Sequence, residues 1–386
     1  MKQDELLQPS SQNPPAAFTQ RLIAWQSQHG RHDLPWQKTR DAYRIWLSEI
    51  MLQQTQVGTV IPYYERFLKR FPTIHLLAAA SIDEVLELWS GLGYYARARN
   101  LHRCACILVQ TRDGEFPKEA EQINLLPGIG RSTAAAIAVF AFGARAAIFD
   151  GNVKRVLARC FGIEGLADSK KAQEAWWSLA ESLLPAQKIE GYTQGLMDLG
   201  ATCCKRSKPL CTTCPMGDIC IARREERQAS LPTAKAKKGL TKRVCSMLLI
   251  SDGERILLER RPASGIWGGL LSLPELTNTA ETAGAAGTGA AAALDSNTQG
   301  MLERFLEHHG CALSELTLLP VLQHRFTHFQ LNIYPLLCRV NAKAHRVNEA
   351  GYSWCSRAAL GSAALPTPVR KIVQDYFLAP PQIAPN

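Results

Sequence analysis

The pattern of hydrophobic and polar positions changes character near residue 240. Before that point, apolar residues recur every three to four positions, which predicts amphipathic helices. We expect the clearest of these helices over residues 18–25, 45–57, 82–89, 98–109 and 132–142. Prolines and glycines stand between them, and Pro62 is one of these expected breakers. The pattern therefore predicts a mainly helical first part of the chain.

After residue 240 the pattern of hydrophobic and polar positions indicates strands as well as helices. Residues 244–251 and 255–259 are apolar, strand-like runs, and the Asp252-Gly253 pair between them is a hairpin signal. Residues 301–308 suit a helix and residues 329–340 another strand. Residues 277–296, rich in Ala, Gly and Thr, are expected to form a flexible loop. This part is predicted to be a mixed α/β domain.

A length of 386 residues favours two domains over a single core. We expect residues 1–17 to be loosely ordered and residues 18–230 to form the helical domain. A linker over 231–243 and a mixed α/β domain over 244–386 would complete the chain.

The charge is positive overall, with a formal net charge of +10. Residues 1–230 hold 28 basic against 23 acidic residues, and the linker adds five basic residues without an acid. This distribution is compatible with nucleic acid bound by the first domain and the linker. A solvated linker between domains explains the five basic residues of the linker equally well. No apolar run is long enough for a membrane helix, and the first residues do not resemble a secretory signal. A cytoplasmic location is the expectation.

Four of the twelve cysteines fall within one short segment, with the spacing Cys204-x6-Cys211-x2-Cys214-x5-Cys220. In a cytoplasmic chain such a group indicates metal binding rather than disulfides. Iron–sulfur clusters and zinc both use four thiolates, so the spacing leaves the metal open. The basic residues over 205–208 would lie on the same loop, where they can meet phosphate. Cys203 is out of register and is interpreted as a bystander.

A glycine-rich hairpin is predicted at residues 126–130, directly before an alanine-rich helix. Gly128 and Gly130 permit a sharp turn and a close approach to a partner. The N–H groups at the start of the helix can then bind a phosphate, which positions DNA without reading its sequence. An ordinary helical hairpin would show the same pattern.

Two carboxylates could carry chemistry. Asp150 precedes a helix expected from about Asn152, where it would serve as an N-cap and remain ionised. Glu49 has three apolar neighbours among the four residues one helical turn away, so its pKa should be raised. The alternative for Glu49 is a buried structural ion pair. An acid that donates a proton and a carboxylate that faces a developing cation together suit cleavage of a glycosidic bond.

Residues 18–225 resemble the helix-hairpin-helix DNA glycosylases that carry a [4Fe–4S] cluster, and in particular the MutY-type adenine DNA glycosylases. Besides the cysteine spacing, the matching motifs lie at residues 34–37, 46–57, 91–95, 149–153 and 197–200. The resemblance implies one [4Fe–4S] cluster on Cys204, Cys211, Cys214 and Cys220. It implies a double-stranded DNA partner in which adenine is mispaired with 8-oxoguanine or guanine, and we expect a monomer. Because the glycosidic bond is inaccessible in the stack, the base must be flipped out.

The resemblance also implies roles for individual residues. Glu49 would protonate adenine N7, and Asp150 would stabilise the sugar cation. Gln194 would contact the flipped adenine. The further residues expected to bind DNA or to insert as wedges beside the lesion pair are Gln54, Tyr94, Gly128, Gly130, Ser132 and Asn152.

Ser132 distinguishes two reaction types. Related bifunctional glycosylase/lyases, such as the thymine-glycol type, carry an attacking lysine directly after the hairpin. Here Ser132 offers no amine for a Schiff base, so a monofunctional glycosylase is expected. A non-enzymatic iron–sulfur DNA sensor is the other alternative, but it would need neither Glu49 nor Asp150.

The second domain resembles the Nudix-like domain of the same family. Residues 265–270 fit its glycine-rich turn, and residues 324–329 fit the loop that inspects 8-oxoguanine, with Phe326, Thr327 and His328 as the expected contacts. An active Nudix hydrolase would need a glutamate-rich metal-binding helix soon after Leu271. The sequence instead continues with Pro274-Glu275 and the alanine-rich segment, so hydrolysis by this domain is not expected.

Overall fold

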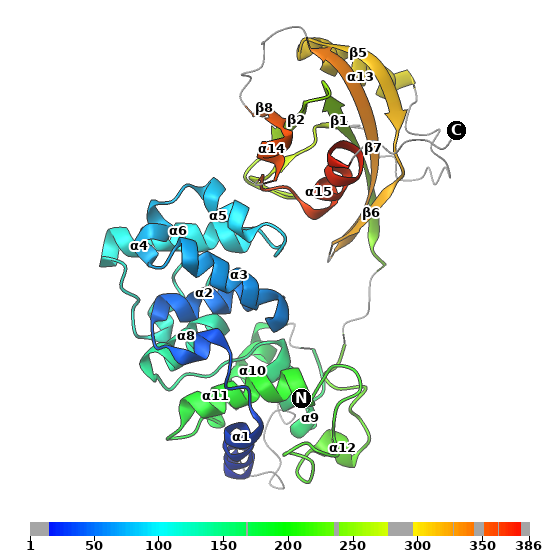
Figure 1. The fold of residues 1–386 in the computed structure, drawn as a ribbon. Helices are drawn as coiled ribbons and strands as arrows, with labels where there is room; N and C mark the ends of the chain where they lie inside the picture. Colours follow the sequence, from blue (N-terminus) through cyan, green and yellow to red (C-terminus); the bar gives the residue numbers. More distant parts are fainter. Residues whose placement is uncertain are drawn as a thin grey trace. The chain divides into compact units, whose positions relative to one another are not determined.

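The chain forms two compact units in the computed structural model (Figure 1). The first comprises Met1–Ala80 and Arg97–Lys237, and the second comprises Ser81–Ala96 and Lys238–Asn386. The structure describes residues 15–166, 169–234, 239–276, 296–326, 328–342, 351–361 and 363–379. Within these ranges, no helix has both the length and the apolar character that crossing a bilayer requires.

Short helices make up the first unit, which confirms the predicted helical class. They are α1 (Pro15–His29), η1 (Pro35–Lys38), α2 (Ala42–Leu52), α3 (Val57–Arg70), α4 (Ile74–Ala79), α6 (Ala96–Arg112), α7 (Ala120–Ile123), α8 (Arg131–Phe142), α9 (Gly151–Cys160), α10 (Lys170–Ser182), α11 (Ile189–Asp198), η2 (Leu199–Cys203) and α12 (Ile221–Arg224). Helix α8 is buried along most of its length because small alanine side chains let α2 and α11 approach it closely.

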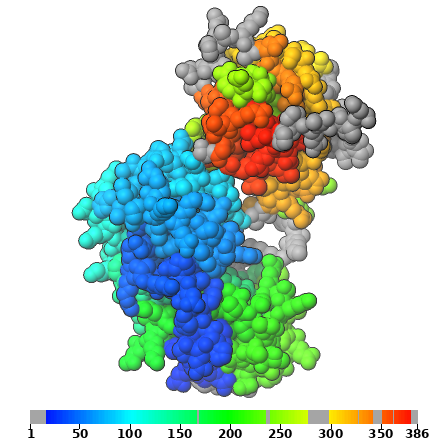
Figure 2. Space-filling model, viewed as in Figure 1, coloured from blue at the N-terminus to red at the C-terminus, as the bar shows by residue number. Residues whose placement is uncertain are grey.

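The N-terminal helix α1 packs against α11, which follows it by about 160 residues in the chain. Figure 2 shows this dark-blue segment side by side with the green segment that holds α11. Phe18 and Leu22 of α1 are buried in the same core as Tyr192 and Leu196 of α11. This pairing brings the end of α1 to the C-terminal half of α11, where the pocket described below is built.

Two helix boundaries differ from the prediction. The helix expected over 45–57 ends at Leu52, and a second helix begins at Val57 after Gln54 adopts a φ of +58°. Pro62, expected to break a helix, lies inside α3. Burial of Val60, Tyr64 and Phe67 against the core stabilises this helix despite the proline.

A mixed sheet forms the second unit, which confirms the predicted α/β class. Its elements are α5 (Ile82–Trp89), β1 (Thr241–Ser251), β2 (Arg255–Arg260), β3 (Leu271–Ser272), β4 (Glu275–Leu276), α13 (Ser296–His308), β5 (Cys311–Leu318), β6 (Leu322–Arg325), β7 (Phe329–Ala342), β8 (Tyr352–Ser356), α14 (Arg357–Leu360), α15 (Thr367–Val373) and η4 (Gln374–Leu378). The strand order is β3-β2-β1-β7-β5, with β4, β6 and β8 pairing with β1, β7 and β2.

The centre of this sheet is the parallel pair of β1 and β7, in register from Thr241–Phe329 to Ser251–Arg339. The predicted β1–β2 hairpin is present, and Asp252 accepts the N–H groups of Glu254 and Arg255 at its turn. Strands β3, β4, β5, β6 and β8 were not predicted. In β5, Ala312 to Glu315 are exposed in succession, so no alternation marks the strand, and the other four strands have at most five residues; pairing with a partner strand defines them. Most of the alanine-rich segment, residues 277–295, lies outside the described residues.

Candidate active site and DNA-binding surfaces

Helix α2 carries Glu49 into a cavity of about 640 Å³. Asp41 caps the start of the helix, where its carboxylate accepts the Tyr43 N–H, and most of the helix side chains are buried. The cavity is also lined by Ile45, Gln194 and Phe140, and its size suits a small organic ligand such as a flipped base. The half-buried Glu49 side chain is therefore an acid presented to a ligand-sized space.

Burial raises the pKa of Glu49 to about 8, and repulsion from the Asp150 carboxylate adds to the effect. The expected raised pKa of Glu49 is thus found. No ion pair of Glu49 with an arginine is seen among the contacts of the described residues, so the structural-pair alternative has no support. A carboxyl group that stays protonated at neutral pH can donate a proton to a leaving group.

Asp150 is the N-cap of α9, as predicted. Its carboxylate accepts the N–H groups of Asn152 at 2.9 Å and Val153 at 2.8 Å, and the side chain remains exposed. The positive end of the helix favours the ionised carboxylate at this position. The structure therefore contains a buried acid of raised pKa and an exposed carboxylate that caps a helix; their catalytic roles remain a prediction.

The segment before Asp150 is held from two sides. The Phe149 N–H donates a hydrogen bond of 2.9 Å to the Ser132 hydroxyl, which joins the start of α8 to the start of α9. The Phe149 ring lies 5.6 Å from the ring centres of both Trp176 and Trp177 of α10. Ser132 thus has a structural contact here, in addition to lacking the amine that a lyase would need.

The glycine-rich turn precedes α8 as predicted. Gly128 has a φ of +76°, and a Cβ at this position would come within 2.6 Å of Asn100 Cβ. Gly130 is the N-cap of α8 and has no side chain that could accept the first N–H groups of this helix. These groups are available for a phosphate oxygen, as at other uncapped helix N-termini.

The two expected wedge residues both have exposed side chains on strained backbone. Gln54 has a φ of +58° and Tyr94 a φ of +50°, and Tyr94 is 47% exposed. Gln54 belongs to the first unit and Tyr94 to the second. Left-handed backbone at a residue other than glycine is costly and concentrates at functional sites.

A buried arginine that sequence analysis missed shapes the turn at Gln54. Arg97 donates to the carbonyl oxygens of Ile50, Met51 and Gln53 at 2.6–2.9 Å. Because α2 ends here, no following helical turn supplies N–H groups to these oxygens, and the arginine takes that place. Its other nitrogen donates to the Thr55 hydroxyl at 3.1 Å. The only sequence signal would have been an arginine within an otherwise apolar helix face.

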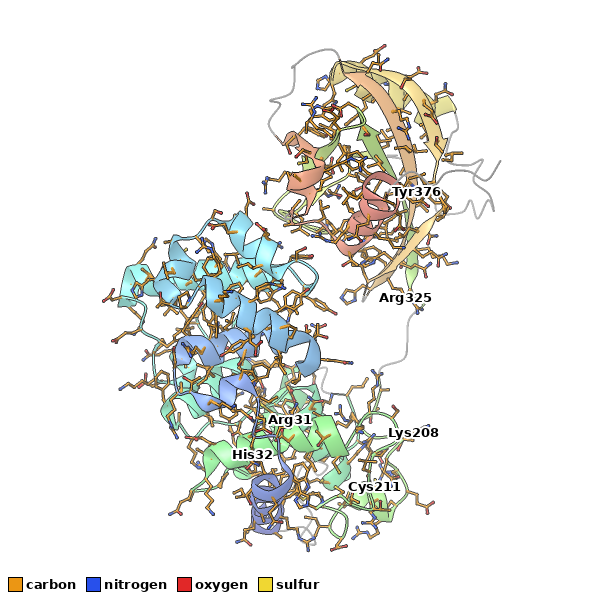
Figure 3. All side chains as sticks on the ribbon, viewed as in Figure 1. Arg31, His32, Lys208, Cys211, Arg325 and Tyr376 are labelled. Atoms are coloured by element: carbon orange, nitrogen blue, oxygen red, sulfur yellow. The ribbon has the colours of Figure 1, made fainter. Side chains whose placement is uncertain are left out.

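The cysteines Cys204, Cys211, Cys214 and Cys220 line one small cavity between α9 and the loop that follows η2. Figure 3 shows Cys211 and Lys208 on this loop. Two further cysteines, Cys160 and Cys203, line the same cavity. Over the described residues, no group of three histidine, cysteine or acidic side chains is placed to hold a single metal ion. The thiol donor set fits a cluster with soft ligands.

Two arginines bond this loop to α9, the helix that Asp150 caps, and neither was predicted. Arg155 donates to the Cys204 carbonyl at 2.7 Å and to the Asn152 side chain at 2.8 Å. Arg159, which is 3% exposed, donates to the Lys205 carbonyl at 2.7 Å and lies 3.5 Å from the Cys204 sulfur. Their spacing of four residues on one helix, directly after Asp150, was the available signal.

In the second unit, the expected lesion-reading loop is the tip of the β6–β7 hairpin. The Phe326 N–H donates to the Phe329 carbonyl at 2.9 Å, and their rings stack at 4.5 Å. The Trp267 ring lies 5.6 Å from that of Phe326. His328 is exposed, and Thr327 lies outside the described residues.

Basic side chains flank this hairpin. The Arg243 guanidinium lies 4.5 Å from the centre of the Phe329 ring, and Arg325 is exposed at the end of β6 (Figure 3). Burial lowers the pKa of His324, so this ring is neutral at physiological pH. The hairpin tip therefore combines aromatic faces with positive charge, which suits a nucleic acid partner.

The comparisons with known proteins define a DNA repair protein of the helix-hairpin-helix class, in agreement with the helical fold of the first unit. HhH-GPD superfamily base excision DNA repair proteins match residues 47–182, and the NUDIX domain family matches residues 245–375. The chain is 36% identical over 360 residues to the adenine DNA glycosylase of Buchnera aphidicola subsp. Acyrthosiphon pisum, covering 93% of this chain and 97% of that one. The chain belongs to the adenine DNA glycosylase family, which confirms the resemblance seen in the sequence.

Other relatives match parts of the chain. The human adenine DNA glycosylase is 42% identical over 232 residues, which cover 58% of this chain and 42% of the human protein. The structure of a thermostable thymine-DNA glycosylase shares 31% identity with a TM-score of 0.51, covering 55% of this chain and 97% of that one.

Proposed function

We propose that this protein removes adenine paired with 8-oxoguanine or guanine in double-stranded DNA, by hydrolysis of the N-glycosidic bond without strand cleavage. The observation that carries the proposal is the raised pKa of Glu49 at a ligand-sized cavity, with the Asp150 carboxylate near enough to act on it through repulsion. Glu49 protonates adenine N7 and so activates the leaving group. Asp150 stabilises the positive charge that develops on the sugar.

The surrounding residues take the supporting roles. Gln194 contacts the flipped base, and Asn152 and the Gly128–Gly130 turn bind the backbone. Gln54 and Tyr94 insert beside the lesion pair, since both side chains are exposed on backbone that is held in place. Phe326, Thr327 and His328 inspect the opposite base.

Single-turnover release of adenine tests this function. The duplexes carry adenine opposite 8-oxoguanine, guanine or thymine, and we expect the rate to fall in that order. His328→Ala should reduce the ratio of the rate opposite 8-oxoguanine to the rate opposite guanine several-fold, which is the effect expected from the loss of about one hydrogen bond. His308→Ala, an exposed histidine on α13, serves as the matched control. Equal rates opposite all three bases would contradict the proposed specificity.

We further propose that Cys204, Cys211, Cys214 and Cys220 hold one [4Fe–4S] cluster, which organises the loop carrying Lys205 and Lys208 for phosphate contact. When bound, the cluster supplies structural cross-linking, and the hydrolysis itself requires no metal.

Metal analysis of purified protein tests the cluster. We expect iron near four per chain and a broad visible absorbance band. Cys214→Ala should lose both. Cys203→Ala should retain them, because Cys203 lines the same cavity but instead donates to the Leu210 carbonyl. Stoichiometric zinc in the unmodified protein would contradict the proposal.

A further inference from the structure

Asp198, at the end of α11, is a fully buried carboxylate with three donors directed at it. The backbone N–H of Arg31 donates to Oδ2 at 2.9 Å, and Arg31 Nε donates to Oδ1 at 2.7 Å. The side-chain amide of Gln194 donates to Oδ1 at 2.8 Å. Figure 3 shows Arg31 beside α11. The charge of Asp198 is thus compensated by Arg31, and its other side-chain contact is Gln194; both of these residues line the cavity.

The contact determines which way the Gln194 amide points. An ionised carboxylate has only acceptors, so Gln194 must turn its NH₂ group toward Asp198. The reverse orientation would place two acceptor oxygens against each other in a buried site, at a substantial cost. The Gln194 carbonyl oxygen is therefore left as the acceptor, and Gln194 lines the cavity that also holds Glu49.

Close packing preserves this arrangement. Gly30 follows α1, and a Cβ at this position would meet the Gln26 carbonyl at 2.5 Å and Asp198 Oδ2 at 3.0 Å. The absence of a side chain at Gly30 lets the chain deliver the Arg31 N–H to the carboxylate. The Arg31 N–H, just after α1, and the Gln194 amide of α11 thus donate to the same buried carboxylate of Asp198.

We propose that Asp198 is a positioning residue for base selection: by fixing the amide of Gln194, it presents a hydrogen-bond acceptor to the 6-amino group of adenine. Adenine carries a donor at this position, whereas guanine carries an acceptor. A misplaced polar group in a site built for hydrogen bonding discriminates strongly between such bases. The inference rests on the proposed function, since it assigns the basis of adenine selection at that site.

The test compares two substrates, adenine and a purine base that lacks the 6-amino group, each placed opposite 8-oxoguanine. Asp198→Asn can donate to Gln194 and permits its amide to reverse. We expect single-turnover release of adenine to fall about 10- to 100-fold, and release of the unsubstituted purine to change less than about threefold. An equal loss on both substrates would show a merely structural role and overturn the inference.

A reciprocal exchange gives a second, independent readout. Gln194→Glu alone sets two carboxylates against each other and should lose adenine release. Combined with Asp198→Asn, it restores a donor on residue 198 and an acceptor toward the base. The new amide at position 198 then loses the Arg31 Nε contact, which also goes to Oδ1, so release should exceed that of either single variant without reaching that of the unmodified protein. Failure of the double variant to exceed both single variants would overturn the inference.

Two controls separate the possible failures. Thr202→Val removes a hydrogen bond to the Asp198 carbonyl without touching its carboxylate, and it should leave both rates unchanged. If the unmodified protein releases no adenine from any duplex, the proposed function itself fails. If it does release adenine but the variants show no dependence on the 6-amino group, only the role of Asp198 is wrong.

Discussion

Glu49→Gln should reduce single-turnover release of adenine by about 10³-fold or more, while binding of the mismatched duplex persists. The amide keeps the shape of the side chain but has no proton to transfer, and general acid catalysis contributes about 10²- to 10⁴-fold. The measurement is adenine release at saturating enzyme, together with a gel-shift titration of the same duplex. Glu174→Gln, an exposed glutamate on α10, is the control. Turnover retained in Glu49→Gln would remove Glu49 from its role.

The same residue predicts the pH profile. In its proposed role Glu49 acts in the protonated form, and burial raises the pKa of Glu49 to about 8. The single-turnover rate should therefore be constant below about pH 8 and fall by up to tenfold for each further pH unit. Glu49→Gln should remove this decline from the residual rate.

Glu49→Gln should raise the stability of the folded protein at alkaline pH, although it lowers activity. The pKa of Glu49 is higher in the folded protein than in the unfolded chain, so the folded state holds its proton where the unfolded chain has released it. Ionisation then favours unfolding progressively as the pH rises from about 4.5 to about 8. Glu49→Gln abolishes this effect and should raise the melting temperature at pH 8.

Asp150→Asn should slow adenine release by roughly 10²- to 10³-fold, because it removes the carboxylate that we propose to stabilise the developing sugar cation. The asparagine oxygen can still accept the N–H groups of Asn152 and Val153, so stability should fall by less than about 1 kcal/mol. The measurement pairs single-turnover kinetics with thermal unfolding. A variant that lost stability and activity in proportion would indicate that Asp150 acts only as a cap.

This variant should also move the pH profile. The Asp150 carboxylate raises the pKa of Glu49 through repulsion, so its removal lowers that pKa. The decline of the remaining rate should therefore begin at a lower pH than in the unmodified protein. An unshifted profile would show that the two carboxylates do not interact.

Much of the site could be predicted because its parts are local in sequence. The apolar residues one turn from Glu49 indicate its burial, and the position of Asp150 before a helix indicates its cap. The glycines at 128 and 130 and the spacing of the four cysteines are likewise short-range patterns. Each feature follows from helix periodicity, capping or backbone sterics, which act over a few residues.

Boundaries and networks could not be predicted in the same way. Pro62 lies within α3 because buried neighbours outweigh the local cost of a proline. Strands β5 and β6 are defined by pairing with β7, and β8 by pairing with β2. Such pairing depends on residues distant in sequence, which no local pattern reports.

The sequence by itself thus determined the helical and α/β classes, the family resemblance, and the residues expected to act. Only the tertiary structure placed Arg31 and Gln194 on the carboxylate of Asp198, and Arg155 and Arg159 on the loop after η2. The physical reason is that burial and hydrogen bonding are properties of what surrounds a group. Asp198 lies 167 residues from Arg31 along the chain, and packing of α1 on α11 makes them neighbours.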